Sequence, residues 1–265
     1  MTSKQKFLEE NYSRYHKVEF LFSDPLEFVL KYSDPKDQEI VGIFSALFAY
    51  GNVKQIRNSI GIWLERIKEF KSPSEWMRAQ DSERNQIWKG FVHRFNPERD
   101  WILISELIHR SVMSYGSIAE HVADIAHQKK LSLTGALDEL ISEWKTKLGA
   151  KKLTPSMKHL LSHPSSGGTC KRWMMFLRWM VREDALDPGT WQKLLKSSTH
   201  QFGTHELVMP LDTHTGRWSR KLRLTRRKTL NWKTALEVTK SLKSIDPIDP
   251  IRYDFSLCRV GMFQK

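Results

Sequence analysis

Hydrophobic residues recur along most of the chain at the three- and four-residue spacing of an α-helix. The pattern is clearest from Ile40 to Phe48, from Ile56 to Ile67 and from Trp101 to Ile108, where apolar side chains would line one helix face. No segment combines the period-2 alternation of a strand with the turn residues of a hairpin. The pattern therefore predicts an all-α protein built from many short helices.

Proline pairs indicate where these helices begin or end. A polar residue before proline suits a helix boundary, because its side chain can accept backbone hydrogen bonds and proline has no N–H to leave unpaired. The pairs are Asp34-Pro35, Ser72-Pro73, Asn96-Pro97, Thr154-Pro155, His163-Pro164, Asp187-Pro188, Asp246-Pro247 and Asp249-Pro250. No fixed-period repeat or low-complexity linker interrupts the chain.

Length and charge narrow the class of protein. The 265 residues suffice for one large domain or two smaller ones, and 43 Lys and Arg against 30 Asp and Glu give a net charge of +13. Such an excess favours an anionic partner, nucleic acid or a membrane surface. No apolar run approaches the roughly 20 residues that span a bilayer, and the first seven residues are charged and unlike a signal peptide. We therefore expect a soluble cytoplasmic protein.

The positive charge is concentrated in two stretches. Lys145 to Arg182 contains nine Lys or Arg and no acid, and Arg217 to Lys233 contains eight and none. These stretches indicate a phosphate-binding surface. The alternative is a pair of solvated helix faces that keep the protein soluble, although such faces usually mix the two signs.

Metal and thiol chemistry have little support in the sequence. Cys170 and Cys258 are too few for a disulfide scaffold, a four-cysteine zinc site or an all-cysteine iron–sulfur cluster. Cys170 could be an activated thiol, but an inert buried cysteine is the more usual interpretation. A metal site is the alternative interpretation of the histidines near Asp212, but no second pair of ligands at a fixed spacing accompanies them. The candidate ligands are His214, His200, His205, His159 and His163. We expect no metal and no cofactor.

The first basic stretch contains a turn rich in serine and glycine, SHPSSGGT, before an expected helix over residues 169–182. Backbone N–H groups at such a turn can bind a phosphate without a charged side chain. The candidate DNA-binding residues of the turn and the helix start are Ser166, Gly167, Gly168, Thr169 and Arg172.

Lys171 falls in the first turn of that helix. A cation there opposes the helix dipole, and the neighbouring Arg172 is expected to lower the pKa of the amine further. This position suits a nucleophile that must be neutral part of the time, or a phosphate contact. A lysine on a solvated helix start is the structural alternative.

A single carboxylate interrupts the segment MPLDTHTGRWSRKLRL over residues 209–224. Asp212 can cap a helix containing Trp218, Leu222 and Leu224. It can also stabilise positive charge on a sugar that loses its base and help to deprotonate an attacking amine, and the two roles are compatible. Candidate DNA contacts that follow it are His214, Arg217, Arg220 and Lys221.

The Ser-Gly turn with its lysine, and PLDTHTGRWSRKLRL, together resemble the helix-hairpin-helix DNA glycosylases that include endonuclease III and the archaeal 8-oxoguanine enzymes. The resemblance implies Lys171 as the nucleophile and Asp212 as the catalytic carboxylate. The separation, 212 − 171 = 41 positions, is longer than in endonuclease III, and the turn is SSGGTCK where those enzymes have Gly-x-Gly.

A second resemblance covers most of the chain. The segments AYGNVKQI, CKRWMMFLRWMVRED, DPGTW, PLDTHT and DPIRYDFSLCRVGM resemble a bacterial family of unknown function, DUF2400. If the glycosylase resemblance holds, the chain forms two helical lobes around a cleft with a helix-hairpin-helix-like element. Residues 36–204 would form a helical barrel lobe that ends in the hairpin, and residues 1–35 with 205–265 the second lobe.

The glycosylase resemblance implies a monomeric, nucleoid-associated DNA repair glycosylase without an iron–sulfur cluster, acting on duplex DNA with oxidised guanine as the favoured base, with or without β-lyase activity. Trp173, Phe176 and Trp179 are candidate base-stacking residues, although aromatic residues at helical spacing more often form the core. The main alternative is a non-catalytic DNA- or RNA-binding protein on the same fold. A metal-dependent nuclease and a protein-binding scaffold are further alternatives.

Overall fold

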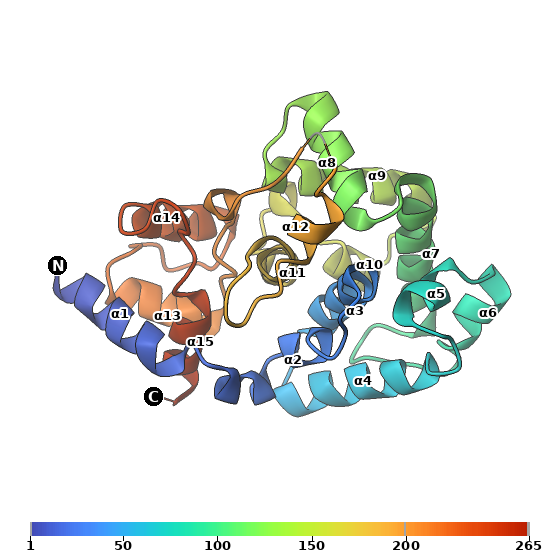
Figure 1. Cartoon of the computed structure of the whole chain (residues 1–265), viewed down its shortest axis with the longest axis horizontal. Coiled ribbons are helices and arrows are strands. Elements are labelled where there is room, and N and C mark those ends of the chain that lie inside the picture. Colours follow the sequence, from blue (N-terminus) through green and yellow to red (C-terminus); the bar gives the residue numbers. More distant parts are fainter. Residues whose placement is uncertain (1, 199, 264–265) are drawn as a thin grey trace.

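The computed structural model describes residues 2–198 and 200–263, and Figure 1 shows how its helices are arranged. Helices dominate and no strand element forms within those ranges, so the predicted all-α class is confirmed. The α-helices are α1 (Ser3–Tyr15), α2 (Leu26–Val29), α3 (Pro35–Phe48), α4 (Val53–Arg66), α5 (Pro73–Arg78), α6 (Asp81–Gln86), α7 (Glu98–Tyr115), α8 (Ile118–Lys129), α9 (Leu133–Leu148), α10 (Pro155–Leu160), α11 (Lys171–Val181), α12 (Thr190–Leu194), α13 (Thr213–Lys221), α14 (Trp232–Lys243) and α15 (Asp254–Phe263). Short 3-10 helices are η1 (Val18–Ser23), η2 (Ala150–Lys152), η3 (Pro164–Ser166) and η4 (Thr204–Glu206).

Several helices begin where capping chemistry predicts. Asp34, Ser72 and Thr154 accept a backbone hydrogen bond from the first turns of α3, α5 and α10, each with proline at the start of the helix. Helix α7 follows Asn96-Pro97, and His163-Pro164 opens η3. These boundaries follow from local backbone chemistry.

Three of the predicted boundary pairs begin no helix. The carboxylates of Asp187 and Asp249 both pair with Arg182, so they are occupied by tertiary contacts. Asp246 accepts the N–H groups of Ile248 and Asp249 and closes a turn. Ion pairs therefore occupy the carboxylate of Asp187, whereas Asp249 divides its oxygens between Arg182 and the N–H of Ile251.

The core is organised around α3, which is buried along nearly its whole length and packs against α2, α4, α5, α11 and α12. In Figure 1 this helix lies in the middle of the molecule. Aromatic rings fill the space on one side of it, and the stacked and edge-on group consists of Phe44, Phe48, Trp63, Trp76, Trp88 and Trp101. Burying such side chains stabilises the fold by about 1.5–3 kcal/mol each. None of the described helices is long and apolar enough to cross a membrane.

Helices from both ends of the chain meet. Both α1 and α13 pack on α15, and Figure 1 shows α14 on the same side of the molecule. Helix α2, which the predicted second lobe also includes, packs instead on α3. The division of the chain into two lobes stays a prediction.

Gly261 sets the distance between α13 and α15. A Cβ at this position would lie 2.6 Å from the Cβ and 3.2 Å from the Cα of His214, so the two helices would have to separate. We expect Gly261→Ala to lower the free energy of unfolding by about 1–3 kcal/mol. Gly61→Ala is the matched control, because a Cβ on this glycine of α4 meets nothing within 4 Å and should stabilise the helix by about 0.5–1 kcal/mol. Denaturant unfolding of the two variants measures both, and equal effects would contradict this account.

Candidate active site

The starts of α11 and α13 meet at an ion pair. Lys171 is the first residue of α11, and Asp212 immediately precedes α13. The Lys171 Nζ lies 3.0 Å from the Asp212 Oδ2. The structure thus brings together the two residues predicted to be catalytic, although 41 positions separate them in the sequence (212 − 171).

The two carboxylate oxygens of Asp212 make different interactions: one caps α13 and the other pairs with Lys171. Its Oδ1 accepts the Thr215 N–H at 2.9 Å, and the Thr215 hydroxyl accepts the Asp212 N–H at 2.8 Å. Its Oδ2 faces Lys171. The predicted helix cap is confirmed, and the cap holds the second oxygen in place for the ion pair. Helix α13 ends at Lys221, earlier than predicted.

The ion pair sets the charge of both groups. Burial disfavours the ammonium of Lys171, but the Asp212 carboxylate outweighs burial and raises the pKa of Lys171 above its ordinary value. Burial likewise disfavours the carboxylate of Asp212, but Lys171 and the Thr215 N–H lower the pKa of Asp212. The expectation that Arg172 and the helix dipole lower the pKa of Lys171 is wrong, because the opposite charge at 3.0 Å dominates. In the resting protein the proton belongs to Lys171.

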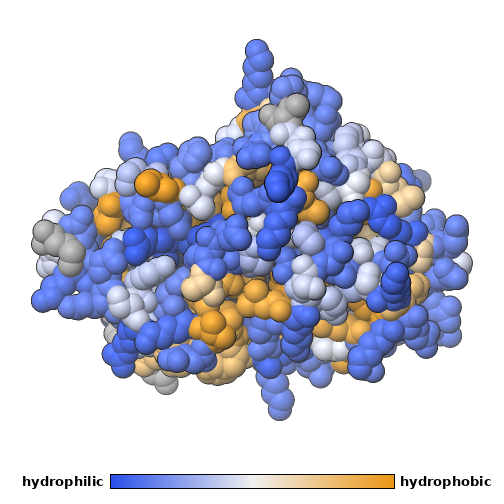
Figure 2. Space-filling model, viewed as in Figure 1, coloured by the Kyte–Doolittle hydropathy of each residue, from blue (hydrophilic) through white to orange (hydrophobic). Residues whose placement is uncertain are grey.

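A cavity of about 390 Å³ opens beside the ion pair. Its walls come from the segment before α2, the α3–α4 turn with the start of α4, the segment before α13, and helices α11, α13 and α15. The lining residues are Asp24, Pro25, Ala49, Tyr50, Gly51, Val53, Ile56, Lys171, Met175, Arg178, Pro210, Asp212, Thr213, His214, Thr215, Asp254, Phe255, Cys258, Arg259 and Met262. The volume lies in the range of small-molecule sites. On the face in Figure 2, apolar side chains gather between α15 and α2 within a largely hydrophilic surface.

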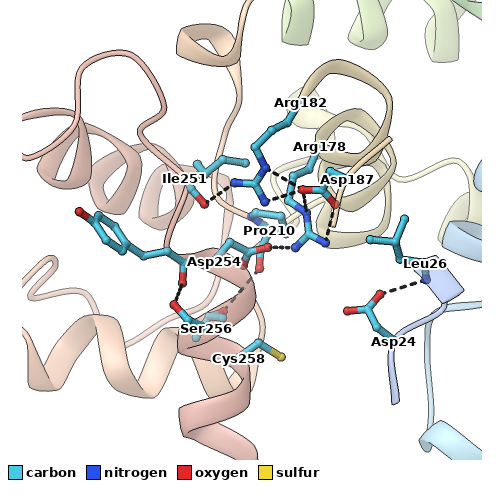
Figure 3. Close-up of polar contacts among 12 residues, drawn as sticks. Asp24, Leu26, Arg178, Arg182, Asp187, Pro210, Ile251, Asp254, Ser256 and Cys258 are labelled. Atoms are coloured by element: carbon cyan, nitrogen blue, oxygen red, sulfur yellow. Dashed lines mark hydrogen bonds and ion pairs between the residues drawn. The ribbon is translucent and has the colours of Figure 1, made fainter. Parts of the chain in front are cut away.

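A buried ionic network joins α11 to α15 (Figure 3). Arg178 pairs with Asp254 at 2.5 Å and with Asp187 at 3.2 Å, and Arg182 pairs with Asp187 at 2.6 Å. Burial opposes the charge of Arg178, but the aspartates outweigh it and raise its pKa. Burial raises the pKa of Asp254, and the nearby charge of Arg178 reduces this rise without cancelling it. Arg178 and Asp254 reach the cavity wall, a position that the sequence analysis missed.

Arg172 is also buried and does not face a possible phosphate. Its guanidinium donates hydrogen bonds to the carbonyls of Leu47 and His159 and lies 5.0 Å from the ring centre of Tyr50. Burial lowers its pKa to about 10. Arg172, Arg178 and Arg182 are all at most 6% exposed, so the predicted phosphate-binding surface does not include these members of the first basic stretch. Their charges instead satisfy buried acceptors.

The Ser-Gly turn lies between α10 and α11 and remains accessible. Ser166, Gly167 and Gly168 are exposed and Thr169 is half-buried. Asp138 anchors the turn by accepting hydrogen bonds from Ser165 and pairing with His163 at 2.8 Å. The N–H groups of Gly168 and Thr169 donate to no acceptor among the described residues. They are therefore available to an external acceptor, two and three residues before Lys171.

The other predicted DNA contacts extend along α13 from the ion pair. His214 is exposed on the cavity wall, and its Nδ1 lies 2.9 Å from the Gly261 carbonyl oxygen. Arg217 donates to the same carbonyl at 3.1 Å, Arg220 is half-buried, and Lys221 is exposed. Both segments of predicted contacts thus begin within a few residues of the Lys171–Asp212 pair.

The three aromatic residues proposed to stack on a base lie in the core. Trp173, Phe176 and Trp179 are at most 1% exposed, and none lines the cavity. The face of α11 toward the cavity carries Lys171, Met175 and Arg178, which follow helical spacing. The core interpretation of the aromatic residues is therefore the one that the structure supports. Tyr50, in the AYGNV segment, and Phe255 are aromatic residues of the cavity wall that the sequence analysis missed.

Neither cysteine is an activated thiol. Burial raises the pKa of Cys170 and of Cys258 to about 12, so the activated-thiol interpretation of Cys170 is wrong. Within the described ranges, no three His, Cys, Asp or Glu side chains lie together in the manner of metal ligands.

The fold and the site define an all-α protein with a lysine–aspartate pair on the wall of a cavity. The chain belongs to the family described as "Protein of unknown function (DUF2400)", whose model matches residues 24–263. That range contains every residue of the cavity wall. No curated protein and no solved structure matches the chain significantly.

Proposed function

We propose that this protein is a DNA N-glycosylase that removes a damaged base, with oxidised guanine favoured. The observation that carries the proposal is the Lys171–Asp212 ion pair on the wall of the 390 Å³ cavity. A lysine beside a carboxylate supplies both a nucleophile and a group that stabilises positive charge on the sugar. The cavity supplies a place for the extruded base.

The proposed partner is duplex DNA of the nucleoid, bound by one copy of the chain. The backbone N–H groups of the Ser-Gly turn and the cations of α13 flank the ion pair and would contact the phosphates on either side of the damaged nucleotide. Binding through several phosphates predicts a steep dependence of affinity on salt.

The reaction begins with the transfer of a proton from Lys171 to the departing base: the bond from C1′ to the base breaks with its electron pair on the base, and the ionised Asp212 stabilises the positive charge on the sugar. The free amine then forms a bond between Nζ and C1′ and gives a second proton to Asp212. Opening of the sugar ring returns the proton of Asp212 to O4′ and leaves a protonated imine between Lys171 and C1′. β-Elimination of the 3′ phosphate can follow from this imine.

Borohydride trapping tests the proposal directly, because borohydride reduces the imine to a stable amine. We expect a covalent adduct with duplexes that carry oxidised guanine, and none with Lys171→Gln. Lys68→Gln is the matched control, since the Lys68 side chain is 68% exposed and is not part of the cavity wall. Duplexes with uracil, oxidised pyrimidines or an abasic site define the range of substrates.

An adduct that persists in Lys171→Gln would contradict the assignment of the nucleophile. The absence of an adduct on every substrate, together with salt-sensitive duplex binding, would reject Lys171 as the nucleophile. Base release without an adduct would then indicate a monofunctional glycosylase that uses Asp212 and water, and no base release would indicate the non-catalytic nucleic-acid-binding protein.

A further inference from the structure

A two-residue turn, Arg94-Phe95, lies at the surface between α6 and α7. The N–H of His93 donates to the Asn96 carbonyl at 3.0 Å, and the N–H of Asn96 donates to the His93 carbonyl at 2.9 Å. Arg94 has a φ of +54°, a left-handed conformation that is unfavourable for a residue with a Cβ. Strained residues of this kind persist where the surrounding structure holds them, and they concentrate at functional sites.

The base of the turn is fixed in the core. His93 and Asn96 are 1% and 0% exposed. The His93 Nδ1 lies 2.7 Å from the Ser59 Oγ, and the Asn96 amide donates to Asp100 at 2.8 Å and to the Ser156 carbonyl at 3.0 Å. The turn is thus a rigid support for the two residues at its tip.

Phe95 presents its ring to solvent from this support. The residue is 52% exposed. A single exposed apolar side chain needs no explanation on its own, but here the exposed ring sits on a strained turn whose base is buried and hydrogen-bonded to the core. A rigidly held ring loses little conformational entropy when a partner covers it.

The turn adjoins the cavity that contains Lys171 and Asp212. The Phe95 ring centre lies 5.4 Å from that of Tyr50, which lines the cavity. The Tyr50 hydroxyl donates to the His93 carbonyl at 3.0 Å. A Cβ on the wall residue Gly51 would lie 2.5 Å from the Arg94 guanidinium. The exposed ring and a cation therefore stand together at the edge of the cavity.

We propose that Phe95 is a wedge that inserts into the base stack of duplex DNA at the position vacated by the damaged nucleotide, with Arg94 against the backbone. This inference rests on the proposed function, since it requires a nucleotide to leave the helix beside the cavity. Extrusion of a base breaks its stacking and pairing, and an apolar side chain between base steps replaces part of the lost stacking. Arg94 supplies the positive charge that a phosphate needs next to the inserted ring.

The test uses a duplex with a stable tetrahydrofuran abasic analogue beside the fluorescent base 2-aminopurine, whose emission rises when it is unstacked. We expect the wild-type protein to raise the emission on binding. Phe95→Ala should remove that rise and weaken binding about 10-fold or more, as aromatic–base stacking is worth roughly 1–3 kcal/mol. Phe95→Trp should retain the rise.

Met113→Ala is the control, because Met113 is 55% exposed near the opposite end of α7 from the turn. An equal rise with Phe95→Ala and the wild type would overturn the wedge, and so would the absence of a rise with the wild type. The readout needs no catalysis. A rise that depends on Phe95, with neither a borohydride adduct nor base release, would therefore retain the wedge and reject the glycosylase. Borohydride adducts together with an equal rise in Phe95→Ala and the wild type would retain the glycosylase and reject the wedge.

Discussion

Asp212→Asn is expected to slow base release by about 10²–10⁴-fold, the usual contribution of a catalytic acid or base. The substitution removes the negative charge that stabilises the sugar cation and accepts the proton of Lys171. The fold should be retained, because asparagine caps helices as well as aspartate does and can still accept the Thr215 N–H. Single-turnover base release from duplex DNA measures the effect, and the Lys68→Gln variant again serves as the control.

The same variant should keep its adduct with an abasic site and form it at lower pH than the wild type. The carboxylate is what raises the pKa of Lys171 against the effect of burial. Without this carboxylate, burial lowers the pKa, so the neutral amine appears earlier as the pH rises. Borohydride trapping on abasic duplex from neutral to alkaline pH measures the shift. Unchanged base release, or a trapping profile that moves to higher pH, would contradict the assigned role of Asp212.

Arg178→Met is expected to lower the free energy of unfolding by about 3–5 kcal/mol, the cost of leaving a buried charge without its partner. The substitution strands Asp254, which is 4% exposed, whereas Asp187 keeps Arg182. Burial already raises the pKa of Asp254, and it should rise further in the variant. A raised carboxyl pKa means that the folded state binds the proton more tightly, so the variant should lose stability as the pH rises from acid toward neutral.

The double variant Arg178→Met with Asp254→Leu removes both charges and should recover much of the lost stability, because an apolar pair of similar size often replaces a buried ion pair at little cost. Denaturant unfolding of the two single variants and the double variant gives the coupling energy between the two positions. A coupling near zero would show that the ion pair does not stabilise the junction of α11 and α15.

Local patterns in the sequence were sufficient to predict the helices and several of their boundaries. Helical spacing predicts α3, α4 and α7, and the caps at Asp34, Ser72 and Thr154 need only the side chain and the next few backbone N–H groups. The cap at Asp212 is predictable for the same reason. The family resemblance added the pairing of Lys171 with Asp212, which no local pattern contains.

The sequence could not predict which charges are solvated. Arg172, Arg178 and Arg182 belong to a run without acidic residues, yet their carboxylate or carbonyl partners come from elsewhere in the chain. The raised pKa of Lys171 has the same origin, because the nearest charge in space is not the nearest in sequence. Electrostatic interactions depend on distance in space, so the charges that neighbour Lys171 along the chain predict the wrong direction for the shift of its pKa.

The sequence by itself determined the all-α class and the net positive charge, and it made Lys171 and Asp212 the candidate catalytic residues. Only the tertiary structure decided that Lys171 and Asp212 touch, that Tyr50, Arg178 and Asp254 share the cavity wall with them, and that Trp173, Phe176 and Trp179 belong to the core. Helical periodicity shows which residues share a face of the helix. It does not show whether that face packs in the core or lines a cavity, because residues in both places recur at the same three- and four-residue spacing. The packing of α11 against α3, with α13 and α15 around the cavity, makes that choice.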